Sequence, residues 1–114
     1  MGGRIITVWD EDFPPLLKKI YDPPLVLYVL GQFDEKDKYS IAVVGTRQPT
    51  NYGKIQTEKI VTDLVNQNIT IVSGLARGID SAAHSSALKN NGRTIAIIGS
   101  GLDVIYPAEN KKLF

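Results

Sequence analysis

Arginines in short glycine-containing turns form the most chemically suggestive feature of this chain. The clearest case is Ser73-Gly74-Leu75-Ala76-Arg77-Gly78, which leads into the small-residue segment 79–84. Glycine lets the backbone approach a ligand closely, and the N–H groups at a helix start attract anions. Arg77 would add a guanidinium where a bound anion sits. These residues predict phosphate binding and leave open whose phosphate is bound.

A second arginine occupies a similar position earlier in the chain. Arg47 follows the apolar run 41–44 and Gly45, and it precedes a helix expected to start near Asn51. Its guanidinium and the first amides of that helix could share one phosphate. The alternative for Arg47 is a structural ion pair with an acid such as Asp80.

The hydrophobic pattern of the second part of the chain predicts the scaffold for these turns. Apolar runs typical of strands covered on both faces alternate with helical segments, and Thr50 is a suitable N-cap. The turn Asn90-Asn91-Gly92 tolerates left-handed backbone and should end the second helix. The expected elements are strands at 41–44, 70–72 and 94–98 and helices at about 51–67 and 78–89. This order predicts an α/β, Rossmann-like open parallel sheet with flanking helices and right-handed crossovers.

Each expected strand ends in a glycine, namely Gly45, Gly74 and Gly99. Ligands of open parallel sheets bind outside the carboxyl ends of the strands. Three backbone-exposing turns at one sheet edge therefore favour a binding site over glycines that merely permit tight turns. Ser73, Gly74 and Gly78 are expected to supply hydroxyl or backbone donors.

The first part of the chain reads as a separate lead-in, and we expect a boundary near residue 40. Residues 13–20 predict a short helix with prolines in its first turn, and residues 25–30 predict a buried strand. Residues 1–40 carry five Lys/Arg and seven Asp/Glu, whereas residues 41–114 carry eight and five, so the local net charges are −2 and +3. The acidic lead-in and the basic remainder are consistent with an anion-binding second part, although a scattered solvated surface would look similar.

Composition excludes several classes of function. The chain has no cysteine, and its longest apolar run, 25–30, is far shorter than a membrane span of about 18 residues. We therefore expect a cytoplasmic protein with no membrane span. One histidine and scattered carboxylates lack the spacing of a metal site, and no cofactor is expected.

A hydrolytic site is the catalytic reading to be weighed. His84 is the only histidine, and Asp80 lies four residues before it on the same helix face. No Gly-x-Ser-x-Gly elbow presents a serine to that pair. We expect Asp80 to complement the helix N-terminus or Arg77, His84 to make a structural hydrogen bond, and the protein not to be an enzyme.

Three motifs carry a resemblance to a known family. These are Val44-Gly45-Thr46-Arg47 continuing to Gly53, Ser73-Gly74-Leu75-Ala76-Arg77-Gly78-Ile79-Asp80, and Gly99-Ser100-Gly101-Leu102-Asp103 followed by Tyr106-Pro107. In this order and spacing the chain resembles the DNA-processing protein A family (DprA, also called Smf). The resemblance implies single-stranded DNA binding in natural transformation, loading of the RecA recombinase, and self-association, commonly as a dimer. It also implies that residues 41–114 are the first half of a longer, extended Rossmann-like domain.

The resemblance and the spacing together define the predicted DNA site. The arginine of the Gly-Ser/Thr-Arg motif is implicated in DNA binding in this family, whereas the position of Arg77 holds either arginine or lysine. Lys111 lies where the family places basic residues along the groove. Tyr52, Tyr106 and Phe114 are candidate stacking platforms for bases. The predicted site comprises Gly45, Thr46, Arg47, Tyr52, Ser73, Gly74, Arg77, Gly78, Gly99, Ser100, Gly101 and Lys111.

One rival class remains. The stretch 73–78 is also similar to the lysine-decarboxylase-like Rossmann proteins, which cleave the sugar–base bond of nucleoside monophosphates. Their Pro-Gly-Gly-x-Gly-Thr-x-x-Glu motif is absent, but it would fall beyond residue 114. Gly99-Ser100-Gly101 and Tyr106-Pro107 favour the DNA binder. A dinucleotide-binding dehydrogenase is weaker, because no Gly-x-Gly-x-x-Gly follows the first strand.

Overall fold

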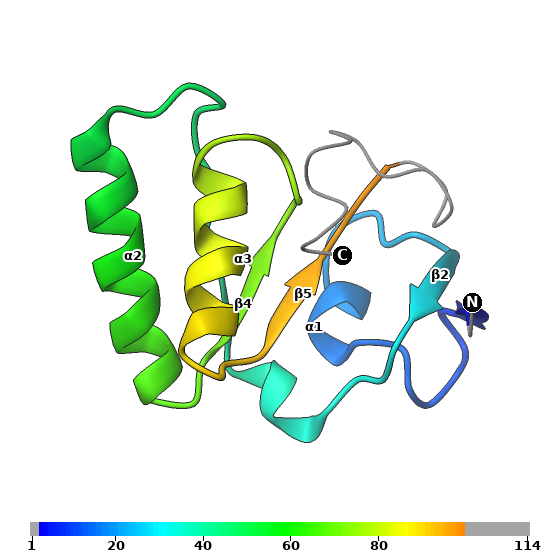
Figure 1. Cartoon of the computed structure of the whole chain (residues 1–114). Coiled ribbons are helices and arrows are strands. Elements are labelled where there is room, and N and C mark those ends of the chain that lie inside the picture. Colours follow the sequence, from blue (N-terminus) through cyan, green and yellow to red (C-terminus); the bar gives the residue numbers. More distant parts are fainter. Residues whose placement is uncertain (1–2, 100–114) are drawn as a thin grey trace. The chain divides into compact units, whose positions relative to one another are not determined.

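The computed structural model describes residues 3–99 of the chain (Figure 1). The backbone contacts divide the chain into two compact units, one ending at Lys38 and the other beginning at Tyr39. Each unit is described by itself.

The first unit is built on a two-stranded antiparallel sheet. Strand β1 (Gly3–Thr7) pairs with β2 (Val26–Leu30), and Ile5 lies opposite Tyr28 in the register. Between them lies the short helix α1 (Pro15–Lys18), whose N-cap is Pro14, and the 3-10 helix η1 (Glu35–Lys38) follows β2. The expected helix is therefore present with a proline in its first turn but is shorter than 13–20.

The prediction of a buried strand at 25–30 is wrong. Exposed and half-buried residues alternate along β2, and 71% of the Tyr28 surface is exposed. Alternate side chains of a strand point to opposite faces of its sheet, and in β2 the face that carries Val26, Tyr28 and Leu30 is exposed. Strand β1 is present in addition to the elements expected from the sequence.

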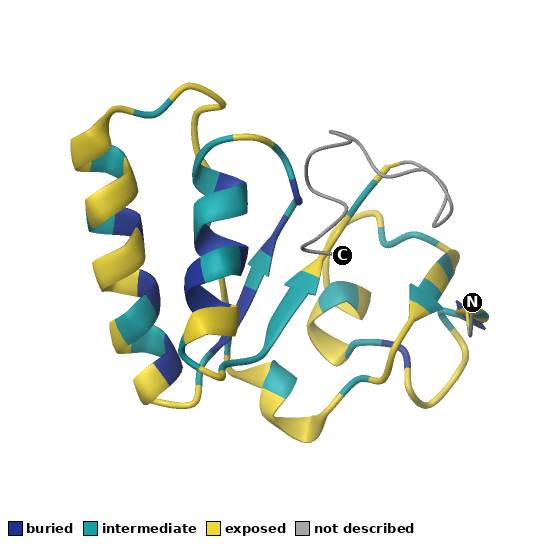
Figure 2. Cartoon of the chain, in the orientation of Figure 1, coloured by how far each residue is buried: buried dark blue, intermediate teal, exposed yellow. Residues whose placement is uncertain are grey.

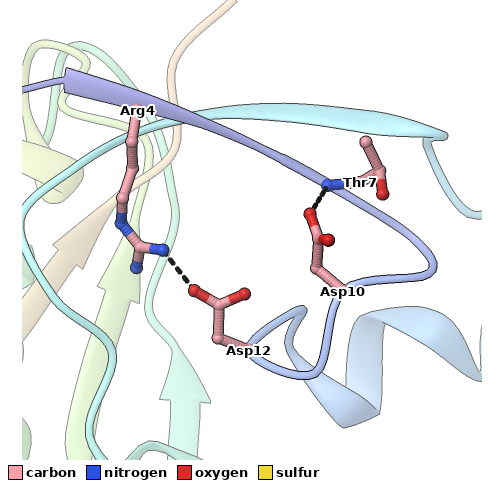
Figure 3. Close-up of polar contacts among 4 residues, drawn as sticks. All are labelled: Arg4, Thr7, Asp10 and Asp12. Atoms are coloured by element: carbon pink, nitrogen blue, oxygen red, sulfur yellow. Dashed lines mark hydrogen bonds and ion pairs between the residues drawn. The ribbon is translucent and has the colours of Figure 1, made fainter.

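Polar contacts fix the turn that follows β1 (Figure 3). The Thr7 N–H donates to Asp10 Oδ2 at 2.7 Å, and the Asp10 N–H donates back to the Thr7 carbonyl at 2.9 Å. The Arg4 guanidinium donates to the Asp12 carboxylate, and this hydrogen bond lowers the pKa of Asp12. Phe13, which comes directly after, is 3% exposed and serves as a core residue of this unit.

The second unit is a three-stranded parallel sheet with two connecting helices (Figure 1). Its strands β3 (Ser40–Ala42), β4 (Thr70–Ser73) and β5 (Thr94–Ala96) lie in the order β3-β4-β5. Helix α2 (Asn51–Asn66) connects the first pair, and helix α3 (Ile79–Lys89) connects the second. The predicted α/β fold with parallel crossovers and flanking helices is confirmed, with β4 as the central strand.

Both helices pack on one face of this sheet. The buried core joins Val61 and Val65 of α2, Ala83 and Ala87 of α3, and Ile71 of β4. Figure 2 shows these buried positions on the inner sides of the two helices and along β4. The small alanines of α3 let the two helices approach each other and the central strand closely.

The expectation that all three strands are covered on both faces is wrong for the outer strands. Ile41 and Val44 are 43% and 67% exposed at the β3 side, and Ile97 is 66% exposed beyond β5. Ile71, in the central strand, is fully buried. Within residues 3–99 the helices cover one face only, and β3 and β5 are edge strands, so their apolar runs are only partly enclosed.

The helix ends follow the capping rules that the sequence indicated. The Thr50 hydroxyl oxygen accepts the Gly53 N–H at 3.1 Å and caps α2. Asn91 adopts the left-handed conformation (φ 57°) after α3, and the Gly92 N–H donates to the Ala87 carbonyl at 2.8 Å. These contacts satisfy backbone groups that a helix end leaves without partners.

Gly53 offers a direct test of the α2 geometry. A Cβ built at Gly53 would meet its nearest atoms at 3.5 to 3.8 Å, which is ordinary van der Waals contact. We expect Gly53→Ala to raise the free energy of unfolding by about 0.5–1 kcal/mol, because alanine loses less backbone entropy in a helix. Chemical denaturation measures this change. Gly92→Ala is the matched control and should destabilise, since its Cβ would lie 2.5 Å from Val65 Cγ1; a destabilised Gly53→Ala would contradict the packing described here.

Candidate nucleic-acid interface

Two loops meet at the carboxyl edge of the parallel sheet. The Arg47 loop (residues 43–50) connects β3 to α2, and the Arg77 loop (residues 74–78) connects β4 to α3. They are joined where the Ile79 N–H, the first of α3, donates to the Thr46 carbonyl at 3.1 Å. Of the three turns predicted to meet at one sheet edge, the first two are therefore brought together, whereas the turn that follows Gly99 lies outside the described residues.

The close approach of the two loops depends on glycine. Gly78 has a φ of 80°, and a Cβ there would lie 2.3 Å from the Thr46 carbonyl oxygen and 2.8 Å from that of Arg47. At Gly45 a Cβ would lie 2.8 Å from the side chain of Ile79. The glycines at 45 and 78 therefore let one loop rest directly on the other.

The side chains of both arginines are exposed at this edge. Within residues 3–99 Arg47 forms no ion pair, so the alternative of a structural pair with Asp80 is not what the structure shows. The Asp80 carboxylate instead accepts the Gly74 N–H at 3.0 Å. Arg47 is left available to an anion in the part of the chain that is described.

Two further predicted residues lie on the same loop and helix. The Thr46 hydroxyl oxygen accepts the Gln48 N–H at 3.2 Å, which shapes the Arg47 loop. Tyr52 stands in the first turn of α2 and is 73% exposed. Its ring is therefore accessible to a base and is not packed between the helix and the sheet.

Ser73 and Gly74 have different roles from those expected. The Ser73 hydroxyl donates to the Val43 carbonyl at 2.7 Å, and its side chain is 3% exposed. The Gly74 N–H is directed to Asp80. The expectation that these two donors face a phosphate is corrected: in this structure both brace the loops from within. A sequence reveals a turn but not the direction in which its amides point.

His84 lies beneath the Arg77 loop and is 2% exposed. Its Nε2 accepts the Leu75 N–H at 3.2 Å, and its Nδ1 lies 2.7 Å from the Thr94 hydroxyl oxygen. Burial lowers the pKa of His84, while the nearby Asp80 carboxylate and the Ser73 backbone partly oppose that effect. The ring nitrogens contact Leu75 and Thr94 and no serine hydroxyl within residues 3–99, so the Ser/His/Asp arrangement is not formed there, and the expected structural hydrogen bond of His84 is confirmed.

The remaining predicted residues lie at the limit of the described chain or outside it. Gly99 is exposed, and nothing lies within 4 Å of a Cβ built there. Ser100, Gly101 and Lys111 lie outside the described residues, as do the stacking candidates Tyr106 and Phe114. One residue that sequence reasoning missed is Leu75, whose φ of 60° is unusual for a bulky side chain.

Residues 3–99 contain neither a cluster of metal ligands nor a membrane-spanning helix. Across residues 3–99, no three His, Asp or Glu side chains gather closely enough to hold a metal ion. The same part of the chain contains no helix long and apolar enough to cross a membrane.

A parallel α/β sheet with two arginine-bearing loops at the carboxyl ends of its strands places the chain among Rossmann-like proteins. Comparison with known proteins narrows this class. The chain belongs to the DNA recombination-mediator protein A family, whose family model matches residues 4–114.

Similar proteins include Protein Smf from Synechocystis and DNA processing protein DprA from Streptococcus pneumoniae. The first is 50% identical over 97% of this chain and 29% of its own length; the second is 47% identical over 94% and 38%. The chain therefore spans about a third of the length of these curated relatives. These relatives favour the DNA-processing family over the nucleotide-cleaving rival.

Two solved structures share the fold. The X-ray structure of DprA from Streptococcus pneumoniae has a TM-score of 0.89 and 44% identity, covering 98% of this chain and 39% of that one. DNA processing protein A from Helicobacter pylori has a TM-score of 0.81 and 34% identity, covering 98% and 49%. The latter structure concerns that protein's mode of binding single-stranded DNA.

Proposed function

We propose that this chain binds the backbone of single-stranded DNA along the edge formed by the Arg47 and Arg77 loops. The observation that carries the proposal is the direct contact of these loops, which brings two exposed arginines to one edge of the sheet. Membership of the family and the single-stranded DNA binding of the Helicobacter pylori relative support the same ligand.

Phosphate contacts would supply most of the affinity. A guanidinium donates two parallel hydrogen bonds to a phosphate, and Arg47 lies just before the N-terminus of α2, where the helix dipole also favours an anion. Arg77 would hold a neighbouring phosphate of the same strand. Such contacts carry no base identity, so binding is expected to be largely independent of sequence.

Tyr52 is proposed as the base-stacking contribution to this interface. It stands in the first turn of α2, the helix that follows the Arg47 loop, and its ring is exposed. Stacking of a base on an aromatic ring is worth about 1–3 kcal/mol and tolerates every base. The full proposed site adds Gly45, Thr46, Gly78, Gly99, Ser100, Gly101 and Lys111, with Ser73 and Gly74 in supporting positions.

The test is a salt titration with labelled oligo-dT. We expect the logarithm of affinity to fall linearly with the logarithm of salt concentration, with a slope of about −0.7 for each phosphate contacted. Affinity that does not respond to salt, or an absence of binding, would contradict the proposal. Release of free base from nucleoside monophosphates would instead support the rival class of nucleotide-cleaving enzymes. We propose no catalytic residue and no cofactor for this chain.

Partners and location are proposed from the family. We propose natural transformation as the setting, a RecA-type recombinase as the recipient of the bound strand, and the cytoplasm as the location. A homo-oligomer, such as a dimer, is also proposed. In the described part of the second unit, β3 and β5 each have an outer edge that could pair with another copy. Light scattering over a concentration series would contradict self-association if the mass stayed that of one chain.

A further inference from the structure

The Arg77 loop is held in a strained conformation from below. Leu75 has a φ of 60° although it is neither glycine nor asparagine, and its side chain is only 2% exposed. Backbone in this region persists only where the surroundings impose it. Three side chains of α3 supply that restraint: Asp80 accepts the Gly74 N–H, His84 accepts the Leu75 N–H, and Ser81 donates to the Ala76 carbonyl.

The hydrogen bonds around His84 assign its proton. The Thr94 hydroxyl donates to the Ile71 carbonyl at 3.0 Å, so its oxygen must accept from His84 Nδ1–H. Nε2 is then unprotonated, as it must be to accept the Leu75 N–H. Protonation of Nε2 would place an N–H against an N–H, and the bond to Leu75 would be lost.

We propose that His84, acting with Asp80, is a positioning residue that holds the Arg77 loop for single-stranded DNA, and that acidification releases the loop by protonating Nε2. The inference rests on the proposed function of the loop. In this proposal, the position of Arg77 at the DNA-binding edge is controlled by His84, a buried side chain that does not itself contact DNA.

The residues around His84 support a loss of the loop conformation at low pH rather than at high pH. Burial is the largest influence on the pKa of His84 and lowers it, while the Asp80 carboxylate opposes that shift. Strands β4 and β5 carry no titratable side chain, and the charged residues of α2, namely Lys54, Glu58, Lys59 and Asp63, are all exposed. Because the folded-state pKa lies below 6.5, the stability that neutral His84 contributes is complete above about pH 6.5 and is lost as the pH falls through the folded-state pKa.

Simple electrostatics predicts the opposite trend for DNA. As the pH falls, the protein gains positive charge at His84 and loses negative charge at its carboxylates, so attraction to phosphate should strengthen. Loss of the loop conformation should instead weaken binding. The direction in which DNA affinity changes with pH therefore shows whether His84 positions the loop or only adds positive charge near the DNA.

The experiment measures oligo-dT affinity and the NMR chemical shift of the Leu75 amide between pH 7.5 and 5. For the native chain we expect the Leu75 signal to titrate together with the His84 ring, and affinity to fall about tenfold at the acidic end. His84→Gln places a non-titrating acceptor where Nε2 lies, so affinity at pH 7.5 should be retained and the acid loss abolished. His84→Ala should bind weakly at both pH values.

Val61→Ala is the matched control, because Val61 belongs to the core cluster of α2, α3 and β4, which includes no residue of the Arg77 loop. It should lower stability yet keep the affinity at pH 7.5 and the Leu75 titration. Native-chain binding that stays constant or tightens on acidification, or a Leu75 signal that ignores the His84 titration, would overturn this inference alone. Absence of salt-dependent binding at pH 7.5 would overturn the proposed function, and the inference with it.

Discussion

Replacing Arg47 by alanine is expected to weaken the binding of oligo-dT about ten- to a hundredfold. The guanidinium is exposed at the sheet edge and forms no ion pair within residues 3–99, so a phosphate would be its principal partner. A hydrogen bond to a charged group contributes about 1.5–3 kcal/mol, which corresponds to that loss. The slope of affinity against salt should also become shallower by about 0.7, the contribution of one phosphate.

Lys89→Ala is the control for this substitution. It removes the same charge from the last turn of α3, the opposite end of that helix from the Arg77 loop. Its effect on affinity should be small and should reflect net charge alone. Equal losses for the two variants would show that Arg47 acts only through long-range attraction, and the proposed contact would be wrong. Arg47→Lys should fall between them, because lysine keeps the charge without the paired donors.

Replacing Gly78 by alanine is expected to lower the free energy of unfolding by about 2–4 kcal/mol and to abolish DNA binding. The substituted residue would be forced into a backbone conformation that costs about 1–3 kcal/mol. Its Cβ would also lie 2.3 Å from the Thr46 carbonyl oxygen, which is backbone and cannot turn aside. The two loops must then separate, and both arginines would move from their positions.

Substitutions at two other glycines distinguish the cost of the backbone conformation from the cost of the steric clash. Their free energies of unfolding are measured by chemical denaturation. Gly31 has a φ of 101° with nothing within 4 Å, so Gly31→Ala should show the cost of conformation without the clash. Gly99 lacks both features, and Gly99→Ala should be close to neutral for stability. If Gly78→Ala were no more destabilising than Gly31→Ala, the close contact of the loops would be contradicted.

The fold of the second unit was predictable because its signals are local. The runs around Ile71 and Ile95, the cap at Thr50 and the turn at Asn91 each specify one element, and the rule for parallel crossovers orders them. The exposure of Ile41, Val44 and Ile97 was not predictable. An apolar run indicates a strand that can be buried, whereas its actual burial depends on which elements lie against each face.

The loops that form the candidate site could be predicted from the sequence, but the directions of their backbone amides could not. The positions of Arg47 and Arg77 follow from strand ends and glycines, which the sequence displays. The inward direction of the Gly74 and Leu75 amides does not, because it depends on Asp80 and His84 reaching back from the next helix. Whether these loops contact DNA remains a prediction that the titrations above would test.

The single hydrogen bond from the Ile79 amide to the Thr46 carbonyl joins segments that are distant in sequence. In native-state exchange, the Ile79 amide can be replaced by deuterium only when the two loops part. Its protection factor is therefore a direct reading of how often the proposed binding surface is assembled. A ligand that requires the assembled surface must slow that exchange in proportion to its saturation, so one backbone proton can report both the opening of the site and its occupancy.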